Sequence, residues 1–241
     1  MAAQPTNTRA IAVYCGSSIG KQQAHVNAAL SVGRALAAQN RPLVYGGGPQ
    51  GLMGIVSNAV LQGGGTVTGV IPYAMQAAGG ERPKTDEIHA GNTDEAGPEP
   101  SKMQTIIVDS MHERKVEMAT RSAGFIGLPG GFGTFEEVLE VTTWTQLGIH
   151  NKPVVLVNVL GFYDPLRQLI QNGVKDGFIG PSNQRLIIFV DGPCHAEHEN
   201  FDWGTAALQA IEKWQGDSIK TQLFDWTKRK DGSSEATVRA T

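Results

Sequence analysis

The sequence predicts an α/β protein with a single Rossmann-like, doubly wound domain, in which helices cover both faces of a mostly parallel sheet. Short apolar runs alternate with longer segments whose apolar residues recur at helical spacing, as in repeated βαβ units. The runs are apolar throughout, which is typical of strands buried on both faces. Three of them end in glycine-rich turns, and the carboxyl ends of parallel strands meet at one edge of a sheet, where ligands bind.

The first half of the chain supplies the first of these units. Apolar residues recur every three or four positions from Val26 to Ala37, which predicts a helix. The β-rich run after Arg9 ends at a glycine turn, and a later apolar run is ended by Pro72. We expect strands at 10–15, 42–45, 66–71 and, shorter, 106–108, and helices at 22–39 and 52–61.

The second half repeats the pattern. The run PVVLVNV at 153–159 has the composition of a buried strand, and the segment before it has helical character. We expect strands at 123–128, 153–159 and 186–190, and helices at 111–121, 135–147, 163–172 and 206–215. Residues 1–217 then form one catalytic domain, interrupted by a long polar loop at 79–104. The polar tail at 218–241 is expected to be partly disordered, mainly in its last ten or so residues.

Composition excludes several classes of protein. The 241 residues are 40% hydrophobic and carry a net charge of −3, with no basic stripe that would bind nucleic acid. No stretch approaches the ~20 apolar residues of a membrane span, and the first nine residues lack the apolar core of a secretory signal. Two cysteines give no disulfide framework. We therefore expect a cytoplasmic protein with no nucleic-acid or membrane partner.

The most informative stretch is LPGGFGTFEE at 128–137, where an apolar run leads into a glycine turn and then into a helix expected to begin near Thr134. Gly130, Gly131 and Gly133 have no Cβ atoms, so the amides of the turn can approach an anion closely. The helix start adds unpaired N–H donors and the positive end of its dipole. This pattern predicts a phosphate site, with Glu137 close to whatever the phosphate carries.

A second glycine motif follows the second expected strand. Gly46, Gly48 and Gly51 match G-x-G-x-x-G, which by itself suggests a dinucleotide fold. NAD and FAD are disfavoured because the motif does not follow the first strand and because residues 66–70 contain no acid for a ribose hydroxyl. From spacing alone, a tight packing turn and a backbone wall against a nucleotide remain equally good interpretations.

Charged residues flank the phosphate turn on both sides. Glu117 and Arg121 have the spacing of an ion pair on a solvated helix face, whereas Arg114 is not needed for that pair and could reach the ligand edge. Glu136 and Glu137 diverge by about 100° on a helix, so both cannot point at one ligand atom. Spacing does not decide which one of them does.

Other reactive residue types have simpler interpretations. His195 and His198 lack the spacing of a helical metal motif, so we interpret both as surface histidines and expect no metal site. Cys15 has no basic neighbour in the sequence and is expected to be a buried structural thiol. Trp144 is expected to pack in the core rather than stack on a base.

Together, PGGFGTFEE at 129–137 and MHERK at 111–115 resemble the LOG (Lonely Guy) family of cytokinin riboside 5′-monophosphate phosphoribohydrolases. The resemblance extends over about residues 10–190. It includes CGSS at 15–18, YGGGPQGLMG at 45–54, GVIP at 69–72, TWTQLGIHNKPV at 143–154 and GFYDPL at 161–166. Members have also been labelled lysine decarboxylases, but the sequence shows no lysine in a pyridoxal-phosphate context.

The resemblance implies hydrolysis of the N-glycosidic bond of an N6-modified AMP, with AMP as a weaker substrate and no metal or organic cofactor. Arg114 and Glu137 match the catalytic residues of the family. Whether Glu137 stabilises the charge on the ribose or activates a water stays open. Whether Arg114 offsets negative charge on the phosphate or on the departing purine also stays open. Glu87 is the best match in the long loop to a substrate-contact glutamate, with Glu81 next. The other implied substrate contacts are Gly16, Ser17, Gly46, Gly47, Gly48, Met111, Lys115, Gly130, Gly131, Phe132, Gly133, Thr134 and Thr143.

The resemblance also implies a homodimer with its active site near the subunit interface. Two rival functions remain: a less specific AMP nucleosidase-like scavenging enzyme, and a non-catalytic nucleotide-binding Rossmann-like protein. The Arg114–Glu137 pair disfavours the second, because a carrier needs the glycine turn but not the carboxylate.

Overall fold

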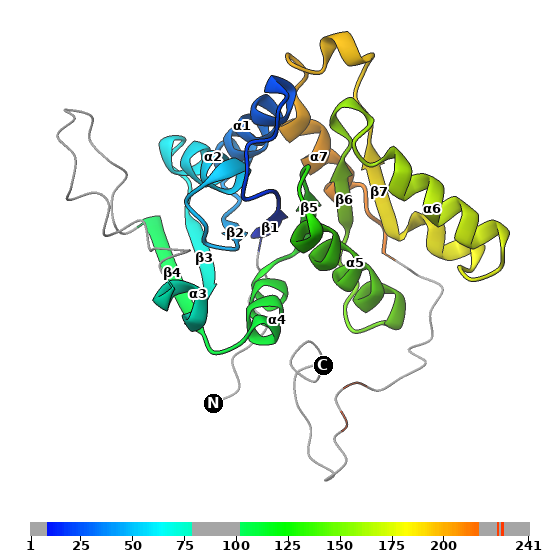
Figure 1. Cartoon of the computed structure of the whole chain (residues 1–241), viewed down its shortest axis with the longest axis horizontal. Coiled ribbons are helices and arrows are strands. Elements are labelled where there is room, and N and C mark those ends of the chain that lie inside the picture. The colour runs from blue at the N-terminus through cyan, green and yellow to red at the C-terminus, as the bar shows by residue number, and fades with distance from the viewer. Residues whose placement is uncertain (1–8, 79–101, 217–225, 227, 229–241) are drawn as a thin grey trace.

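The computed structural model describes residues 9–78 and 102–216, together with 226 and 228, and these form an α/β fold around one parallel sheet. The sheet has seven strands in the order β4-β3-β2-β1-β5-β6-β7, and every neighbouring pair is parallel (Figure 1). The strands are β1 (Ile11–Tyr14), β2 (Leu43–Tyr45), β3 (Val67–Pro72), β4 (Met103–Val108), β5 (Gly124–Gly127), β6 (Val154–Val157) and β7 (Ile187–Val190). The order reverses between β1 and β5, which is the switch point where open α/β sheets bind ligands.

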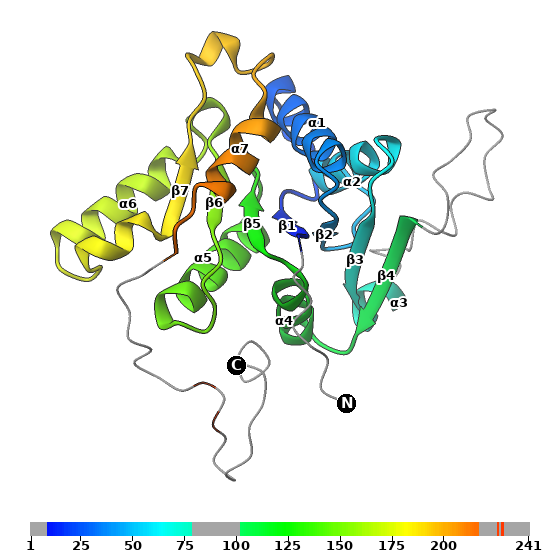
Figure 2. The same cartoon turned by 180° about the vertical axis from the view of Figure 1, so that it is seen from behind.

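Helices cover both faces of the sheet, as predicted. They are α1 (Gln23–Ala38), α2 (Gly51–Gln62), α3 (Tyr73–Ala77), α4 (Met111–Arg121), α5 (Phe132–Leu147), α6 (Asp164–Lys175) and α7 (Trp203–Glu212). Figure 1 and the reverse view in Figure 2 show α1, α2 and α7 on one side of the sheet and α4 and α5 on the other. Short 3-10 turns are η3 (Val159–Gly161), η4 (Pro181–Leu186) and η5 (His195–Glu197).

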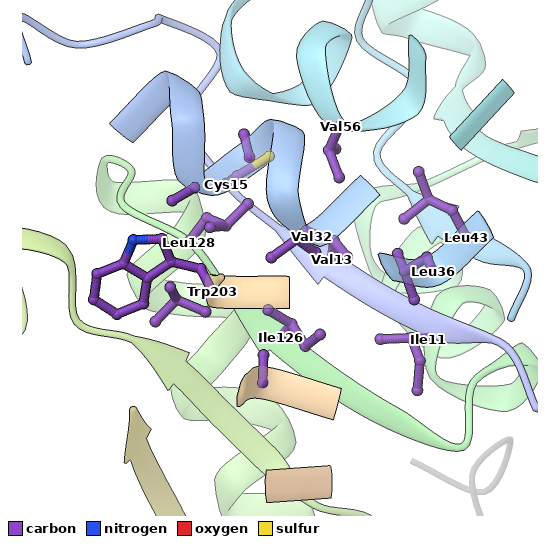
Figure 3. Packing of buried hydrophobic residues seen from close by; sticks show 14 of the residues in the cluster. Ile11, Val13, Cys15, Val32, Leu36, Leu43, Val56, Ile126, Leu128 and Trp203 are labelled. Atoms are coloured by element: carbon purple, nitrogen blue, oxygen red, sulfur yellow. The ribbon is translucent and has the colours of Figure 1, made fainter. Parts of the chain in front are cut away.

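Alternate side chains of the strands fill two hydrophobic cores. On β1, Ile11 and Val13 belong to the core under α1, α2 and α7, whereas Ala12 and Tyr14 belong to the core under α4, α5 and α6. Figure 3 shows the first of these cores, with Trp203 of α7 among the buried side chains. Because both faces are buried, the strands can be apolar throughout, which is the signal that the sequence carries.

Some element boundaries differ from the predicted ones. Helix α5 begins at Phe132 instead of near residue 134 or 135, because Gly131 is an extended N-cap and its carbonyl accepts the amide of Phe135 at 3.1 Å. Strand β4 begins at Met103, so the last two residues of the expected 79–104 loop pair with β3 instead. Helix α3 was not expected. Helix α7 starts three residues earlier than predicted, at a side-chain cap made by Asp202.

One histidine prediction is wrong. His198 is 1% exposed, and its Nδ1 accepts the amide hydrogen of Leu160 at 2.8 Å, so it is a buried structural residue. Its ring also packs edge-on against Trp203. His195 is exposed, as expected. The predictions of a buried Cys15 and a packed Trp144 are confirmed.

The predictions for residues 79–101, including Glu81 and Glu87, lie outside the described residues, as does the predicted disorder of the tail. Among the helices that the structure describes, none combines the length and apolar character needed to cross a bilayer.

Candidate active site at the carboxyl edge of the sheet

The three glycine-rich turns meet at the carboxyl edge of the sheet, as the sequence predicts. The amide of Gly16 donates to the carbonyl of Pro129 at 3.0 Å, which joins the turn after β1 to the turn after β5. The carbonyl of Gly16 accepts the amide of Leu52 at 3.0 Å, which joins the first turn to the start of α2. Gly51 has φ +61°, and a Cβ there would lie 2.2 Å from the backbone of Ser17. Only a glycine allows this approach.

The turn between β5 and α5 presents a helix start to open space. A Cβ on Gly130 would lie 2.1 Å from Oγ1 of the buried Thr134, so close packing requires glycine there. A Cβ on Gly131 or Gly133, in contrast, would meet no atom within 4 Å, and Phe132 is 92% exposed. Since the first amides of a helix have no partner within the helix, this turn has the geometry of an anion site.

A cavity of about 310 Å³ adjoins this turn. It lies at the switch point between β1 and β5, and its walls come from the turn after β1, the starts of α1 and α2, and the turn before α5. The lining residues are Gly16, Ser17, Ser18, Ile19, Gly20, His25, Leu52, Pro129, Gly130, Gly131 and Phe162.

Arg114 lies at the same edge, in the first half of α4. The helix begins at the N-cap Ser110, whose side chain accepts the amide of Glu113, and the Glu113 side chain accepts the amide of Asp109. Arg114 is 6% exposed, and its Nη2 donates to the carbonyl of Gly46 at 2.9 Å. The sequence-based expectation that Arg114 reaches the edge is therefore correct.

The environment of this guanidinium is tightly packed. Its Nη1 lies 3.9 Å from Sδ of Met75 on α3 and 3.8 Å from Sδ of Met111 at the start of α4. Gly46, Gly47 and Gly48 are all buried, and a Cβ on Gly47 would lie 2.2 Å from Ile71. These contacts favour the packing interpretation of the second glycine motif, in which the carbonyl of Gly46 also holds Arg114.

Glu137 and Arg114 both act on Tyr14, the last residue of β1. Burial raises the pKa of Tyr14 well above its ordinary value, the charge of Glu137 raises it further, and the charge of Arg114 lowers it. Burial also raises the pKa of Cys15, with a smaller contribution from Glu137. The charge of Glu137 therefore lies within electrostatic range of the end of β1, as do the charges of Glu140 and Glu136.

Lys115 contacts other side chains of the protein. Its Nζ lies 2.6 Å from Glu136 and 2.9 Å from Glu140, so it links α4 to α5. Burial lowers the pKa of Lys115, but these two hydrogen bonds outweigh burial and raise it overall. Glu136 thus points toward α4, and the role of Glu137 beside a ligand stays a prediction.

Thr143 is not part of this cluster in a single chain. It is exposed on α5, its hydroxyl donates to the carbonyl of Leu139 at 2.8 Å, and it lies six residues beyond Glu137, or about 9 Å along the helix. It lines a smaller cavity of about 160 Å³ with Ile170 and Ile179. In the part of the chain that the structure describes, no group of three His, Cys, Asp or Glu side chains could hold a metal ion.

Sequence reasoning did not single out Tyr14, Met75 or His25 as residues of this edge. The position of Tyr14 at the end of the first strand is a signal that could have identified it. Met75 and His25 carry no such signal, because they reach the edge through α3 and through the packing of α1.

The fold and this edge define a Rossmann-like α/β protein with a cavity beside glycine-rich turns at its topological switch point. Comparison with known structures agrees with the fold: the molybdenum cofactor carrier protein of Chlamydomonas reinhardtii superposes with a TM-score of 0.54 at 19% identity. The match covers 86% of this chain and 100% of that one. At such low identity this likeness shows the fold alone.

Sequence comparison identifies the family. A family model described as "Possible lysine decarboxylase" matches residues 53–198. The chain is 40% identical over 227 residues to the probable cytokinin riboside 5′-monophosphate phosphoribohydrolase LOGL2 of Oryza sativa subsp. japonica, covering 93% of this chain and 86% of that protein. It is 44% identical over 185 residues to the cytokinin riboside 5′-monophosphate phosphoribohydrolase LOG3 of Arabidopsis thaliana, covering 77% and 78%. The chain belongs to the LOG family.

Proposed function

We propose that this protein is a hydrolase that cleaves the N-glycosidic bond of cytokinin riboside 5′-monophosphates and releases the free base and ribose 5-phosphate. The observation that carries the proposal is the buried Arg114, held by the Gly46 carbonyl at the same sheet edge as the anion turn and Glu137. The activity named for the LOG relatives agrees with it. AMP is proposed as a weaker substrate.

The order of these groups along the edge matches the order of the parts of a nucleotide. The glycine turn at 130–133 follows β5, Glu137 acts electrostatically on Tyr14 at the end of β1, and Arg114 is held at the end of β2. Since neighbouring strands are about 4.8 Å apart, the outer two groups are separated by roughly 10 Å along the edge. A phosphate at the turn would place the ribose near Glu137 and the purine near Arg114.

This order assigns a role to each group in the proposed reaction. Loss of the base builds positive charge on the ribosyl ring, and an ionised carboxylate at Glu137 stabilises that charge. Arg114 offsets the negative charge that the departing purine acquires, and water supplies the hydroxyl of ribose 5-phosphate and the proton of the base. The water-excluded position of Arg114 strengthens its interaction with developing charge.

The test is an HPLC assay of wild type, Glu137→Gln and Arg114→Ala with N6-isopentenyl-AMP, AMP, isopentenyladenosine and lysine. We expect Glu137→Gln to retain affinity for ribose 5-phosphate and to lose turnover, and Arg114→Ala to lose activity as well. Glu117→Gln, which removes an ion pair with Arg121 within α4, is the matched control. Cleavage by Glu137→Gln at the wild-type rate would exclude Glu137 as the catalytic carboxylate. Cleavage of isopentenyladenosine as fast as of the monophosphate would exclude the phosphate as the anchor of the substrate. Release of cadaverine from lysine would favour a decarboxylase.

We further propose that the protein works as a homodimer in the cytoplasm. Phe132 is 92% exposed and Leu139 is 42% exposed on the outer face of α5, close to the position of Thr143. A second copy packed on this face would cover these apolar side chains and could bring its own Thr143 to the site, which a single chain does not. Both cysteines are unpaired, as expected in a reducing compartment.

Light scattering after size-exclusion chromatography tests this assembly. We expect a dimer for wild type and a monomer with reduced activity for Leu139→Asp, which leaves the glycine turn at 130–133 unchanged. A wild-type monomer with full activity would contradict the proposal.

A further inference from the structure

The cavity at the switch point contains one ionisable side chain, His25, on the first turns of α1. The other polar side chains of its lining, Ser17 and Ser18, are both exposed, and the rest of the wall is backbone and apolar side chains. His25 is half-buried and comes from the opposite side of the sheet to Glu137 and Arg114. It therefore lines the cavity with Gly130 and Gly131 from the face of the sheet opposite to those two residues.

The imidazole of His25 is held by its surroundings. It packs edge-on against Phe162, with the ring centroids 6.1 Å apart and the planes at 77°. On the other side, Gly20 adopts φ +74°, and a Cβ there would lie 3.0 Å from Nδ1 of His25. Phe162 is itself stacked on Phe135 of α5. The ring is thus confined between the loop after β1 and an aromatic side chain that also contacts the helix of the anion turn.

This confined ring has hydrogen-bonding capacity to offer a ligand. Within residues 9–78 and 102–216, neither ring nitrogen of His25 makes a hydrogen bond to the protein. Burial lowers its pKa from the usual 6.5, so at neutral pH the free protein presents a neutral imidazole with one N–H donor and one acceptor. A donor held in place beside an anion site loses little entropy when it binds.

We propose that His25 binds the phosphate of the substrate, donating a ring N–H to a phosphate oxygen held by the amides of Gly130 and Gly131. The ligand class is a ribose 5-phosphate monoester, so this inference rests on the proposed function for its substrate. It adds a side-chain contact to an anion site that the sequence motif builds from backbone alone. His25 acts in binding, and the bond-breaking step does not involve it.

Isothermal titration with ribose 5-phosphate tests the proposal without depending on turnover. His25→Phe keeps an aromatic ring against Phe162 and removes the donor, and we expect it to weaken binding about tenfold or more, since bonds to charged groups are the strong ones. His25→Gln restores a donor and is expected to remain within about threefold of wild type. His195→Phe, at an exposed histidine outside the cavity, is the matched control and is expected to bind as wild type does.

The same variants give a kinetic readout with N6-isopentenyl-AMP, where we expect His25→Phe to raise KM by a similar factor while kcat changes by less than about threefold. Binding by His25→Phe within twofold of wild type would overturn the inference, and so would an equal loss for unphosphorylated ribose. If wild type binds ribose 5-phosphate through His25 but cleaves no nucleotide, the proposed function fails and this inference stands. If wild type cleaves the nucleotide and His25→Phe binds ribose 5-phosphate as wild type does, the proposed function stands and this inference fails.

Discussion

Replacement of Gly46 by alanine should displace Arg114 while leaving the sheet intact. A Cβ on Gly46 would lie 2.0 Å from Nη2 of Arg114 and 3.1 Å from its Cζ. The guanidinium therefore has to retreat by roughly 1 Å to reach a tolerable contact, and the 2.9 Å hydrogen bond to the Gly46 carbonyl is then lost or bent. The backbone of Gly46 is not in the left-handed region, so alanine itself is not strained there.

The magnitude follows from these contacts. Loss of a hydrogen bond from a buried charged group costs about 1.5–3 kcal/mol of folding free energy, because Arg114 is 6% exposed and water replaces the carbonyl poorly. A displacement of about 1 Å in a catalytic group can reduce the rate about 100-fold. We therefore expect kcat/KM for N6-isopentenyl-AMP to fall by roughly 100-fold, with an unchanged circular dichroism spectrum.

Gly180→Ala is the matched control, since a Cβ there has no neighbour nearer than 3.7 Å. Its activity should equal that of wild type. A Gly46→Ala protein with wild-type kcat/KM would refute the reasoning, because it would show that the position set by the Gly46 carbonyl is not needed for turnover.

Three further predictions concern stability, each measured by urea unfolding. Lys115→Met loses both ion pairs to α5, so its free energy of unfolding should be about 1 kcal/mol lower than that of wild type. Lys115→Arg should recover most of this loss. Equal stability of Lys115→Met and wild type would contradict a link between α4 and α5. Burial, with a smaller effect of the Lys152 charge, lowers the pKa of His150 to about 3. Below pH 6.5, His150 therefore binds a proton in the unfolded chain but not in the folded one. The free energy of unfolding should fall as a result, by about 2 kcal/mol between pH 6.5 and pH 5. His150→Gln should lack this contribution, and an identical pH dependence in both proteins would exclude it. Asp202→Ala removes the N-cap of α7, which accepts the amide of Thr205 at 3.1 Å, and should cost about 1 kcal/mol; Asp202→Asn should cost less, and equal losses in both variants would argue against capping.

The sequence predicts the fold because its signals are local. Short apolar runs, three of them ended by glycine-rich turns, mark the strands, and the helical period marks α1, α4 and α6 within a few residues of their observed bounds. The weaker predictions fail where the deciding contact is distant: Met103 and Gln104 become strand residues because β3 lies beside them. His198 is buried because α7 and η3 fold over it, which no pattern around residue 198 encodes.

The residues of the candidate site divide in the same way. By itself the sequence determined the alternation of strands and helices, the glycine turn at 130–133 and the presence of an acid beyond it, since these depend on backbone freedom and on neighbours in the chain. Only the tertiary structure decided that Arg114 donates to a carbonyl 68 residues away, that Lys115 binds two glutamates of another helix, and that His25 lines a cavity with Gly130 and Gly131. The physical reason is that these contacts join residues that are distant in the sequence, and such residues become neighbours only when the helices pack.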